Sequence, residues 1–327
     1  MLSLTKRSRL AAAAVGCSLV LSACSSSDDD SVSQPGSSDK PSASAGPKLS
    51  GTLQIDGSST VAPLSEAAAE GFQEENKDVN VVVGTSGTGG GFEKFCAGET
   101  DISDASRPIK EKEIEACKAA GITYEEITVA NDGLAVVVNS DNPIKCLTVE
   151  QLKKIWEPSS KVANYNEVDP SFPDLELKLF GPGTDSGTFD YFTGEINGKE
   201  GESRTDYQPS EDDNVIVKGV QGNPGGLGYF GLSYVEENPG AVKALEVDGG
   251  EGCVAPSTET VLDGTYTPLG RPLFIYASTK TVERPEGLAF LEYYIENSDE
   301  IAEQALFVPL SEEQKKEAEA KIKALEG

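Results

Sequence analysis

The sequence predicts an α/β fold, because an apolar strand, a loop rich in glycine and hydroxyl side chains, and a helix follow one another at three places. A helix N-terminus carries unpaired N–H groups and partial positive charge, and glycine lets a ligand approach the backbone closely. Three such loops would make one anion site if they converge. The alternative for each loop alone is a plain helix cap without a ligand.

The first two of these strand-loop-helix units lie near the start of the part of the chain that is predicted to fold. The first spans 52–76 with the loop Asp56–Thr60, and the second spans 79–96 with the loop Gly84–Gly91. The apolar spacing after the second loop predicts a helix that begins at Phe92. The second loop also carries two hydroxyl side chains, so it has the composition of an anion-binding loop.

The third unit spans 177–196, with the loop Gly181–Thr188 between its strand and its helix. Before it, a short strand ends in a turn that presents Ser106 and Arg107. A guanidinium is a planar donor fork suited to clamp an oxyanion, although an arginine in such a turn is usually a surface residue or pairs with a carboxylate. We expect the three loops to converge on one anion rather than to act as independent caps.

The remaining elements complete the α/β pattern. Helices are expected over 110–120, from a Thr148 cap to about Trp156, over 287–295 and after a Ser311 cap, and strands are expected over 134–139 and 273–277.

The composition excludes several classes of function. The chain has 327 residues, of which 27 are basic and 55 acidic, so its formal charge of −28 disfavours nucleic acid and anionic membrane surfaces as partners. It has no histidine, which removes Ser-His-Asp and Cys-His catalysis and histidine zinc sites. We expect no cofactor and no metal ion.

The N-terminus predicts export and lipidation. Basic residues precede a short apolar run, and Leu21–Cys24 resembles the lipobox of bacterial lipoproteins, in which the cysteine carries the lipid. Residues 1–23 would be the signal peptide and 24–49, poor in large apolar residues, a disordered tether. The alternative is an ordinary secretory cleavage site with Cys24 incidental. Removing the signal peptide leaves 24 basic and 55 acidic residues, a charge of about −31.

Four further cysteines predict two disulfides in an exported chain. Of the three connectivities we favour Cys96–Cys117 and Cys146–Cys253, because the first pair closes a short loop and the second then lies within a separate segment. Loop-closure estimates give these bonds roughly 3 and 5 kcal/mol of stabilisation. Metal binding is a weaker interpretation, since no CxxC pair occurs.

Four segments resemble the periplasmic or lipid-anchored phosphate-binding proteins that feed the phosphate-specific ABC transporter. They occur in that family's order and extend over nearly the whole mature chain. The segments are Gly57–Pro63 (GSSTVAP), Ser86–Gly90 (SGTGG), Asp101–Arg107 (DISDASR) and Thr184–Thr188 (TDSGT).

The resemblance implies a type II periplasmic-binding-protein fold, in which two α/β lobes joined by two crossover strands enclose the ligand cleft. The crossings would lie near Leu134–Val138 and Arg271–Tyr276. Lobe 1 would then comprise 50–134 and 273–327, and lobe 2 would comprise 135–272. One expected disulfide falls in each lobe, which leaves the hinge free to close.

The resemblance also implies which positions bind the anion. In lobe 1 the binding positions lie in the two loops and in the turn after the short strand. The second loop offers a serine and a threonine as rival positions. In lobe 2 the binding positions are a Ser-Gly-Thr sequence. The implied positions are Ser59, Thr60, the backbone N–H of Val61, Ser86 or its rival Thr88, Ser106, Ser186, Gly187 and Thr188.

Two positions depart from the family's pattern. Many members have an aspartate where this chain has Ser106, and an arginine where it has Pro182. We expect Arg107 to supply the missing guanidinium. A pocket made only of donors cannot reject sulfate, so the ligand's proton needs an acceptor. The candidates are Asp185 first, then Asp56 and Asp104.

These features predict a monomeric surface lipoprotein that binds inorganic phosphate and delivers it to the permease subunits of an ABC transporter, without chemistry on the ligand. Its membrane contact would be the lipid anchor alone, and it would bind no nucleic acid. One alternative is a binder of sulfate, molybdate or another tetrahedral oxyanion. Others are an exported phosphatase, whose metals only carboxylates could hold, and an adhesin on the same fold with a vestigial pocket.

Overall fold

The computed structural model describes residues 48–184, 186–237 and 239–327, without the side chain of residue 237. The predicted signal peptide, nearly all of the tether, Cys24 and Asp185 lie outside these residues. Within the described ranges, no helix combines the length and the apolar character needed to cross a membrane.

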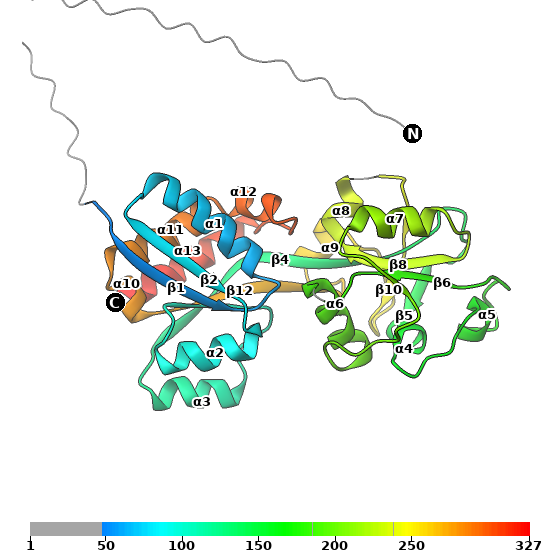
Figure 1. The fold of residues 1–327 in the computed structure, drawn as a ribbon, viewed down its shortest axis with the longest axis horizontal. Coiled ribbons are helices and arrows are strands. Elements are labelled where there is room, and N and C mark those ends of the chain that lie inside the picture. The colour runs from blue at the N-terminus through cyan, green and yellow to red at the C-terminus, as the bar shows by residue number, and fades with distance from the viewer. Residues whose placement is uncertain (1–47, 185, 238) are drawn as a thin grey trace, which may run out of the picture. The chain divides into compact units, whose positions relative to one another are not determined.

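The strands form one large and one small sheet (Figure 1). The large sheet has the order β2-β1-β3-β12-β4-β8-β6-β7, with β9 paired to β4, and the small sheet has the order β11-β10-β5. β1 is parallel to β2 and β3, whereas β12 is antiparallel to β3 and β4. The strands are β1 Gly51–Gly57, β2 Val79–Gly84, β3 Ile102–Ala105, β4 Tyr124–Val138, β5 Cys146–Thr148, β6 Lys178–Gly181, β7 Gln208–Pro209, β8 Gly226–Gly231, β9 Lys243–Ala244, β10 Glu246–Asp248, β11 Cys253–Val254 and β12 Gly270–Ser278.

Helices cover both faces of the β2-β1-β3 part of the large sheet, with α1 and α11 on one side and α2 and α3 on the other (Figure 1). The helices are α1 Ala62–Glu75, α2 Gly87–Ala97, α3 Glu111–Ala119, α4 Val149–Trp156, α5 Tyr165–Val168, α6 Gly187–Phe192, the π-helical turn η1 Thr193–Asn197, α7 Asp213–Gln221, α8 Leu232–Glu237, α9 Thr258–Leu262, α10 Thr279–Val282, α11 Pro285–Glu296, α12 Ser298–Gln304 and α13 Glu312–Glu326.

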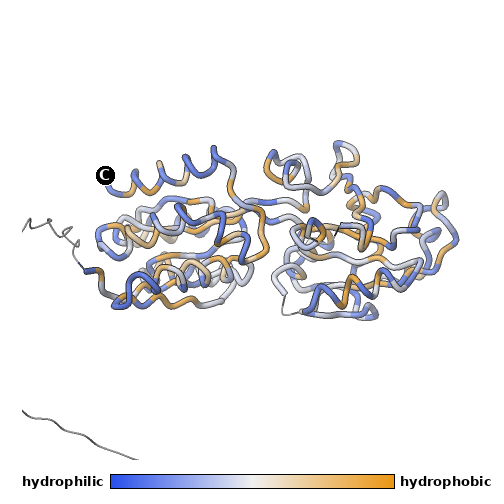
Figure 2. Tube along the Cα trace, turned by 90° about the horizontal axis from the view of Figure 1, so that it is seen from above, coloured by the Kyte–Doolittle hydropathy of each residue, from blue (hydrophilic) through white to orange (hydrophobic). Residues whose placement is uncertain are grey.

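The amphipathic pattern of the last helix explains how it packs. Figure 2 shows hydrophilic and hydrophobic residues alternating along α13, which ends at the C-terminus. Ala318, Ile322 and Leu325 are its buried residues, and their spacing of three and four places them on one helical face. The predicted Ser311 cap is confirmed, since its side chain accepts a hydrogen bond from the backbone N–H of Gln314.

Two hydrophobic cores lie along the large sheet, and each includes a different part of the crossover strand β4. The first core includes Ile127, Val129 and Ala130 of β4 and Leu273 of β12, whereas the second includes Leu134 to Val138 of β4 and Leu269 just before β12. A smaller cluster around Phe92 lies under α2 and α3. The chain therefore forms two lobes joined by β4 and β12.

The second helix begins earlier than the sequence predicts. α2 starts at Gly87 instead of Phe92, so most of the glycine-rich stretch is its first turn. Close packing accounts for these glycines, because an ideal Cβ on Gly91 would lie 2.5 Å from the Cα of Gly57 and 2.8 Å from Oγ of Ser103. Contact with the neighbouring strands outweighs the low helix propensity of glycine.

Both disulfides have the predicted pairing. Cys96 on α2 bonds to Cys117 on α3, and Cys146 on β5 bonds to Cys253 on β11. Each bond lies within one lobe. The Thr148 cap of α4 is also confirmed, with a reciprocal hydrogen bond to Gln151.

Candidate functional site

The candidate site lies where β1, β2 and β3 end. Because the three strands are parallel, the loops that follow them meet at one edge of the sheet, where α/β proteins commonly bind ligands. A small cavity of about 50 Å³ lies there, between these loops and residues of lobe 2 and β12. Its lining residues are Ser58, Ser59, Thr60, Gly87, Thr88, Ser106, Asp190, Tyr191, Glu200 and Arg271.

The loop after β1 supplies hydroxyl groups from a fixed backbone. The N–H of Ser58 donates to the carbonyl of Asp104 on β3 at 2.9 Å, and the N–H of Thr60 donates to Oγ of Ser58 at 3.2 Å. Thr60 is 8% exposed, so its hydroxyl is held in a largely dehydrated place. The N–H of Val61 donates to the carbonyl of Ser58 at 3.2 Å, and Val61 does not line the cavity.

The two rival positions in the loop after β2 lie in different surroundings. Ser86 turns away from the cavity, and both its N–H and its hydroxyl bond to the carboxylate of Asp56. Thr88 lines the cavity, with its Oγ1 lying 3.0 Å from Oγ of Ser106. Thr88 and Ser106 therefore form a continuous hydroxyl wall on the lobe 1 side.

Arg107 lies beside this wall, and its guanidinium is paired with a carboxylate. Its two terminal nitrogens donate to the carboxylate of Glu113 at 2.9 and 2.7 Å, and its Cζ lies 5.6 Å from the ring centroid of Phe92. It does not line the cavity, although one terminal nitrogen lies 3.9 Å from an ideal Cβ on Gly89 in the first turn of α2. Although burial raises the pKa of Glu113, the hydrogen bond from Arg107 and further interactions hold this pKa below its usual value.

Arg271 lines the cavity, although the sequence analysis did not select it as a site residue. It lies opposite Asp132 in the pairing of β12 with β4, and its Nε and a terminal nitrogen each lie 3.3 Å from the Asp132 carboxylate. The other terminal nitrogen donates to the carbonyl of Ser106 at 3.0 Å. Its Cζ lies 3.4 Å from the ring centroid of Tyr191 on α6. Arg271, itself on the crossover strand β12, thus contacts lobe 1, lobe 2 and the other crossover strand, β4.

Lobe 2 closes the cavity with α6. Ser186 caps this helix by accepting a hydrogen bond from the N–H of Thr188 at 3.2 Å, and neither residue lines the cavity. Gly187 lies against Thr60 of lobe 1, because an ideal Cβ on Gly187 would lie 2.6 Å from Oγ1 of Thr60. Asp190 and Tyr191 are the α6 residues that line the cavity.

The contact between Gly187 and Thr60 gives a prediction about lobe closure. A Gly187→Ala substitution should weaken anion binding by roughly 5- to 150-fold, because overpacking of a tight contact costs about 1–3 kcal/mol. Isothermal titration calorimetry measures the loss, and small-angle X-ray scattering with and without phosphate reports closure. Gly231→Ala is the matched control, because an ideal Cβ there meets nothing within 4 Å. Affinity within threefold of the unmodified chain would contradict the prediction.

The carboxylates considered as proton acceptors lie in different surroundings. Asp56 pairs with Lys94 at 2.5 Å, and although burial raises its pKa, bonds from Lys94 and Ser86 hold it below the usual value. Asp104 is fully buried under the loops and accepts a hydrogen bond from Ser65 at 2.8 Å, and burial raises its pKa to about 7. Neither lines the cavity. Asp185 lies outside the described residues.

Two carboxylates that the sequence analysis did not select line the cavity, Asp190 and Glu200. Burial raises the pKa of Asp190, Glu200 raises it further, and Arg271 opposes the rise. Burial also raises the pKa of Asp132, with Arg271 again opposing the rise. The cavity therefore combines hydroxyl donors, one guanidinium and two acceptors.

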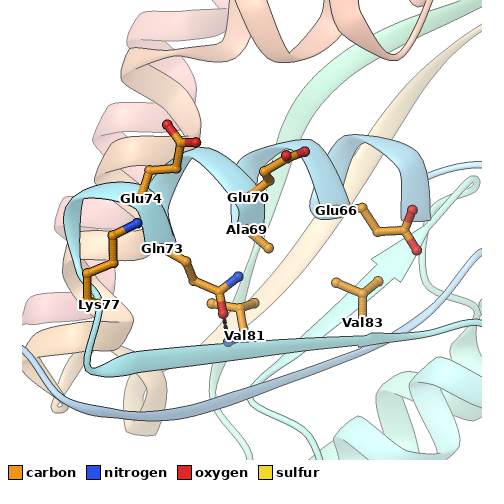
Figure 3. Close-up of a pocket in the computed structure, with 8 residues that line it drawn as sticks. All are labelled: Glu66, Ala69, Glu70, Gln73, Glu74, Lys77, Val81 and Val83. Carbon is orange, nitrogen blue, oxygen red and sulfur yellow. Dashed lines mark hydrogen bonds between the residues drawn. The ribbon is translucent and has the colours of Figure 1, made fainter. Parts of the chain in front are cut away.

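A larger groove of about 380 Å³ lies between α1 and the edge strand β2 (Figure 3). Glu66, Glu70 and Glu74 line its α1 side, and Gln73 reaches the edge of β2 by accepting a hydrogen bond from the N–H of Val81 at 2.9 Å. Three carboxylates on one helical face repel an anion, so this groove does not suit an oxyanion.

The described residues contain one group of potential metal ligands, namely Cys146, Glu246 and Cys253. The two sulfur atoms are bonded to each other, so these residues do not form a metal site.

Comparisons with known proteins agree with this architecture. A family model described as the PBP superfamily domain matches residues 42–300. The phosphate-binding protein PstS of Staphylococcus saprophyticus is 40% identical over 312 residues, which cover 94% of this chain and 92% of that protein. Protein SphX of Synechococcus elongatus is 50% identical over 261 residues, which cover 79% of this chain and 77% of that protein.

The similarity extends to a solved structure. The crystal structure of a possible phosphate binding protein from Planctomyces limnophilus superposes with a TM-score of 0.82 at 45% identity, covering 85% of this chain and 100% of that chain. The predicted two-lobed α/β fold is therefore confirmed. The chain belongs to the PBP superfamily and, within it, to the family of the phosphate-binding PstS proteins.

Proposed function

We propose that this protein binds inorganic phosphate outside the cytoplasm and delivers it to the permease subunits of an ABC transporter. It acts as a binding protein and not as an enzyme. In this proposal Cys24 carries a lipid that anchors a monomer at the outer face of the cell membrane. Lobe 1 (50–134 and 273–327) and lobe 2 (135–272) move as units about the crossover strands.

One observation carries the proposal. Hydroxyl groups of Thr60, Thr88 and Ser106, from three loops of lobe 1, converge with the guanidinium of Arg271 on one small cavity. A partly buried cluster of neutral donors and one cation suits a small oxyanion, because charge-assisted hydrogen bonds are stronger than neutral ones. The relatives at 40% and 50% identity include a protein named for phosphate binding, which supports phosphate as the oxyanion.

The negative charge of the chain does not oppose this function. The formal charge is −28, but exposed charges are screened beyond about 10 Å at 0.1 M salt. Binding depends on short-range contacts inside the closed cavity. The acidic exterior slows the approach of the anion and leaves the bound contacts intact.

Titration calorimetry with phosphate, and with sulfate in competition at pH 7, tests the proposal on the exported chain. We expect saturable binding of one phosphate per chain and at least tenfold weaker binding of sulfate. Equal affinity for the two anions would contradict the phosphate assignment in favour of a general oxyanion binder. Absence of binding to both would overturn the proposed function.

A further inference from the structure

Asp104 is a fully buried carboxyl group that no cation neutralises. It lies on β3, is 0% exposed, and has the apolar Ile275 of β12 opposite it in the sheet. Among the described residues, no lysine or arginine forms an ion pair with Asp104, and its Oδ2 has no hydrogen-bond partner. By contrast, the buried Asp132 is paired with Arg271. An unpaired charge is costly inside a protein, so these surroundings favour the protonated carboxyl group.

Two hydroxyl groups form a chain from Asp104 to the helices α1 and α11, which lie on the same side of the sheet (Figure 1). Ser65 on α1 donates to Oδ1 of Asp104 at 2.8 Å, and its Oγ lies 3.3 Å from the hydroxyl oxygen of Tyr294 on α11. All three side chains are buried. A hydroxyl group can donate or accept, and a protonated carboxyl group offers an O–H donor, so reversing the direction of the hydrogen bonds suits the neutral form. Asp104 can therefore gain or lose a proton while the chain stays intact.

The titratable groups that face Asp104 act on its proton affinity. Asp56 of β1 and Glu66 of α1 bring negative charge, whereas Tyr294 stays neutral because burial and Asp104 raise the pKa of its hydroxyl well above the usual value. Burial raises the pKa of Asp104 to about 7. The hydrogen bond from Ser65 opposes this rise, and the two neighbouring carboxylates support it. Near neutral pH, both protonation states of Asp104 are therefore accessible.

Asp104 lies beneath the loops of the anion cavity without lining it. Its carbonyl accepts a hydrogen bond from the N–H of Ser58 at 2.9 Å, and Ser106 follows it by two residues. Both serines line the cavity. A bound oxyanion adds negative charge there, and charges inside a protein are screened less by salt than exposed ones. A nearby like charge favours the neutral form of a carboxyl group, so a bound anion should increase the proton affinity of Asp104.

We propose that Asp104 takes up a proton when the anion binds, so that phosphate binding by this protein is coupled to proton uptake. The proton comes from the buffer, a carboxylate oxygen of Asp104 receives it, and the carboxylate loses its charge. The proposal rests on the proposed function and adds a proton site that does not touch the ligand. Because linkage between two binding sites is reciprocal, a lower pH strengthens phosphate binding through Asp104.

Titration of Asp104→Asn with inorganic phosphate at pH 6 and pH 8.5 tests the proposal. Asparagine cannot ionise, so the variant resembles the neutral carboxyl group at both pH values. At pH 6 its affinity should lie within threefold of the unmodified chain, in which Asp104 is largely protonated. At pH 8.5 the variant should bind at least threefold more tightly, because the unmodified chain must take up a proton or hold two negative charges close together. The ionisation of phosphate itself affects both proteins equally and cancels in their ratio.

Asp78→Asn is the matched control, because it makes the same chemical change at an exposed position of lobe 1. Its affinity relative to the unmodified chain should be the same at both pH values. Thermal melts check that each variant is folded. Infrared difference spectroscopy on the unmodified chain tests the proposal without a substitution, since phosphate added at pH 8 should produce the carbonyl band of a protonated carboxyl group.

The outcomes separate the inference from the proposed function. If the unmodified chain binds phosphate, an affinity ratio of Asp104→Asn to this chain that is equal at pH 6 and pH 8.5 would overturn the inference alone. Absence of the infrared band would do the same. An equal shift in Asp78→Asn would also overturn it, by assigning the effect to overall charge. Failure of the unmodified chain to bind phosphate at either pH would overturn the proposed function.

Discussion

Replacing Arg271 with methionine is expected to abolish measurable phosphate binding and to lower the free energy of unfolding by about 3–5 kcal/mol, the range for breaking a buried ion pair by removing one partner. Asp132 is 6% exposed in its side chain and its cationic partner is Arg271, so the substitution leaves a buried carboxylate uncompensated. The substitution also removes the guanidinium from the anion cavity and from the Tyr191 ring. Chemical denaturation and titration calorimetry measure the two losses separately.

The stability loss should depend on pH in a definite direction. Burial raises the pKa of Asp132 above 3.8, and Arg271 opposes the rise. Without Arg271 the folded-state pKa rises further, so the unfolded chain releases its proton more readily than the folded chain. The destabilisation therefore grows as the pH rises above the unfolded pKa and is smallest below it.

The double variant Asp132→Asn with Arg271→Met is the control for this explanation. It removes both charges, so most of the lost stability should return while phosphate binding stays absent. A loss below 1 kcal/mol in the single variant, or a double variant no more stable than the single one, would show that the pair is not the buried contact described above.

Replacing Arg107 with alanine is expected to weaken phosphate binding by about 2–4 kcal/mol, the range for truncating one partner of a buried charged contact. Glu113 occupies two nitrogens of this guanidinium at 2.9 and 2.7 Å and thereby fixes its plane beside the first turn of α2. A guanidinium has five N–H donors, so donors remain for an anion after this pairing. We therefore propose that Arg107 acts as a second cation at the lobe 1 edge of the cavity.

Titration calorimetry on Arg107→Ala measures this effect, with Lys118→Ala as the control for the loss of one positive charge. Lys118 lies in an exposed position of the last turn of α3, so its removal should leave phosphate affinity within threefold. A loss under threefold in Arg107→Ala would remove Arg107 from the site and leave Arg271 as the cation of the cavity.

The two arginines illustrate what can be inferred from adjacent residues and what cannot. Arg107 follows Ser106 in a turn after a short strand, so its neighbourhood could be anticipated from local sequence. Its pairing with Glu113 is also local, six residues along the chain. Arg271 meets Asp132 across 139 residues, a contact that depends on the register between β12 and β4. Nothing in the local sequence of either residue indicates this register.

The sequence by itself determined the succession of strands, hydroxyl-rich loops and helices along the chain and the capping residues, because these depend on local periodicity and on neighbours along the chain. The cysteine pairing favoured from the sequence rested on one short loop and on a separate segment for the second bond, and the structure confirms it. Thr60, Thr88 and Ser106 were among the positions that the resemblance to phosphate-binding proteins implied, and all three line the cavity. Tertiary structure alone decided that Ser86 turns to Asp56, and that Asp190, Glu200 and Arg271 face the cavity. These contacts arise where two lobes and two crossover strands meet, so their geometry is set by packing between segments that are distant in sequence.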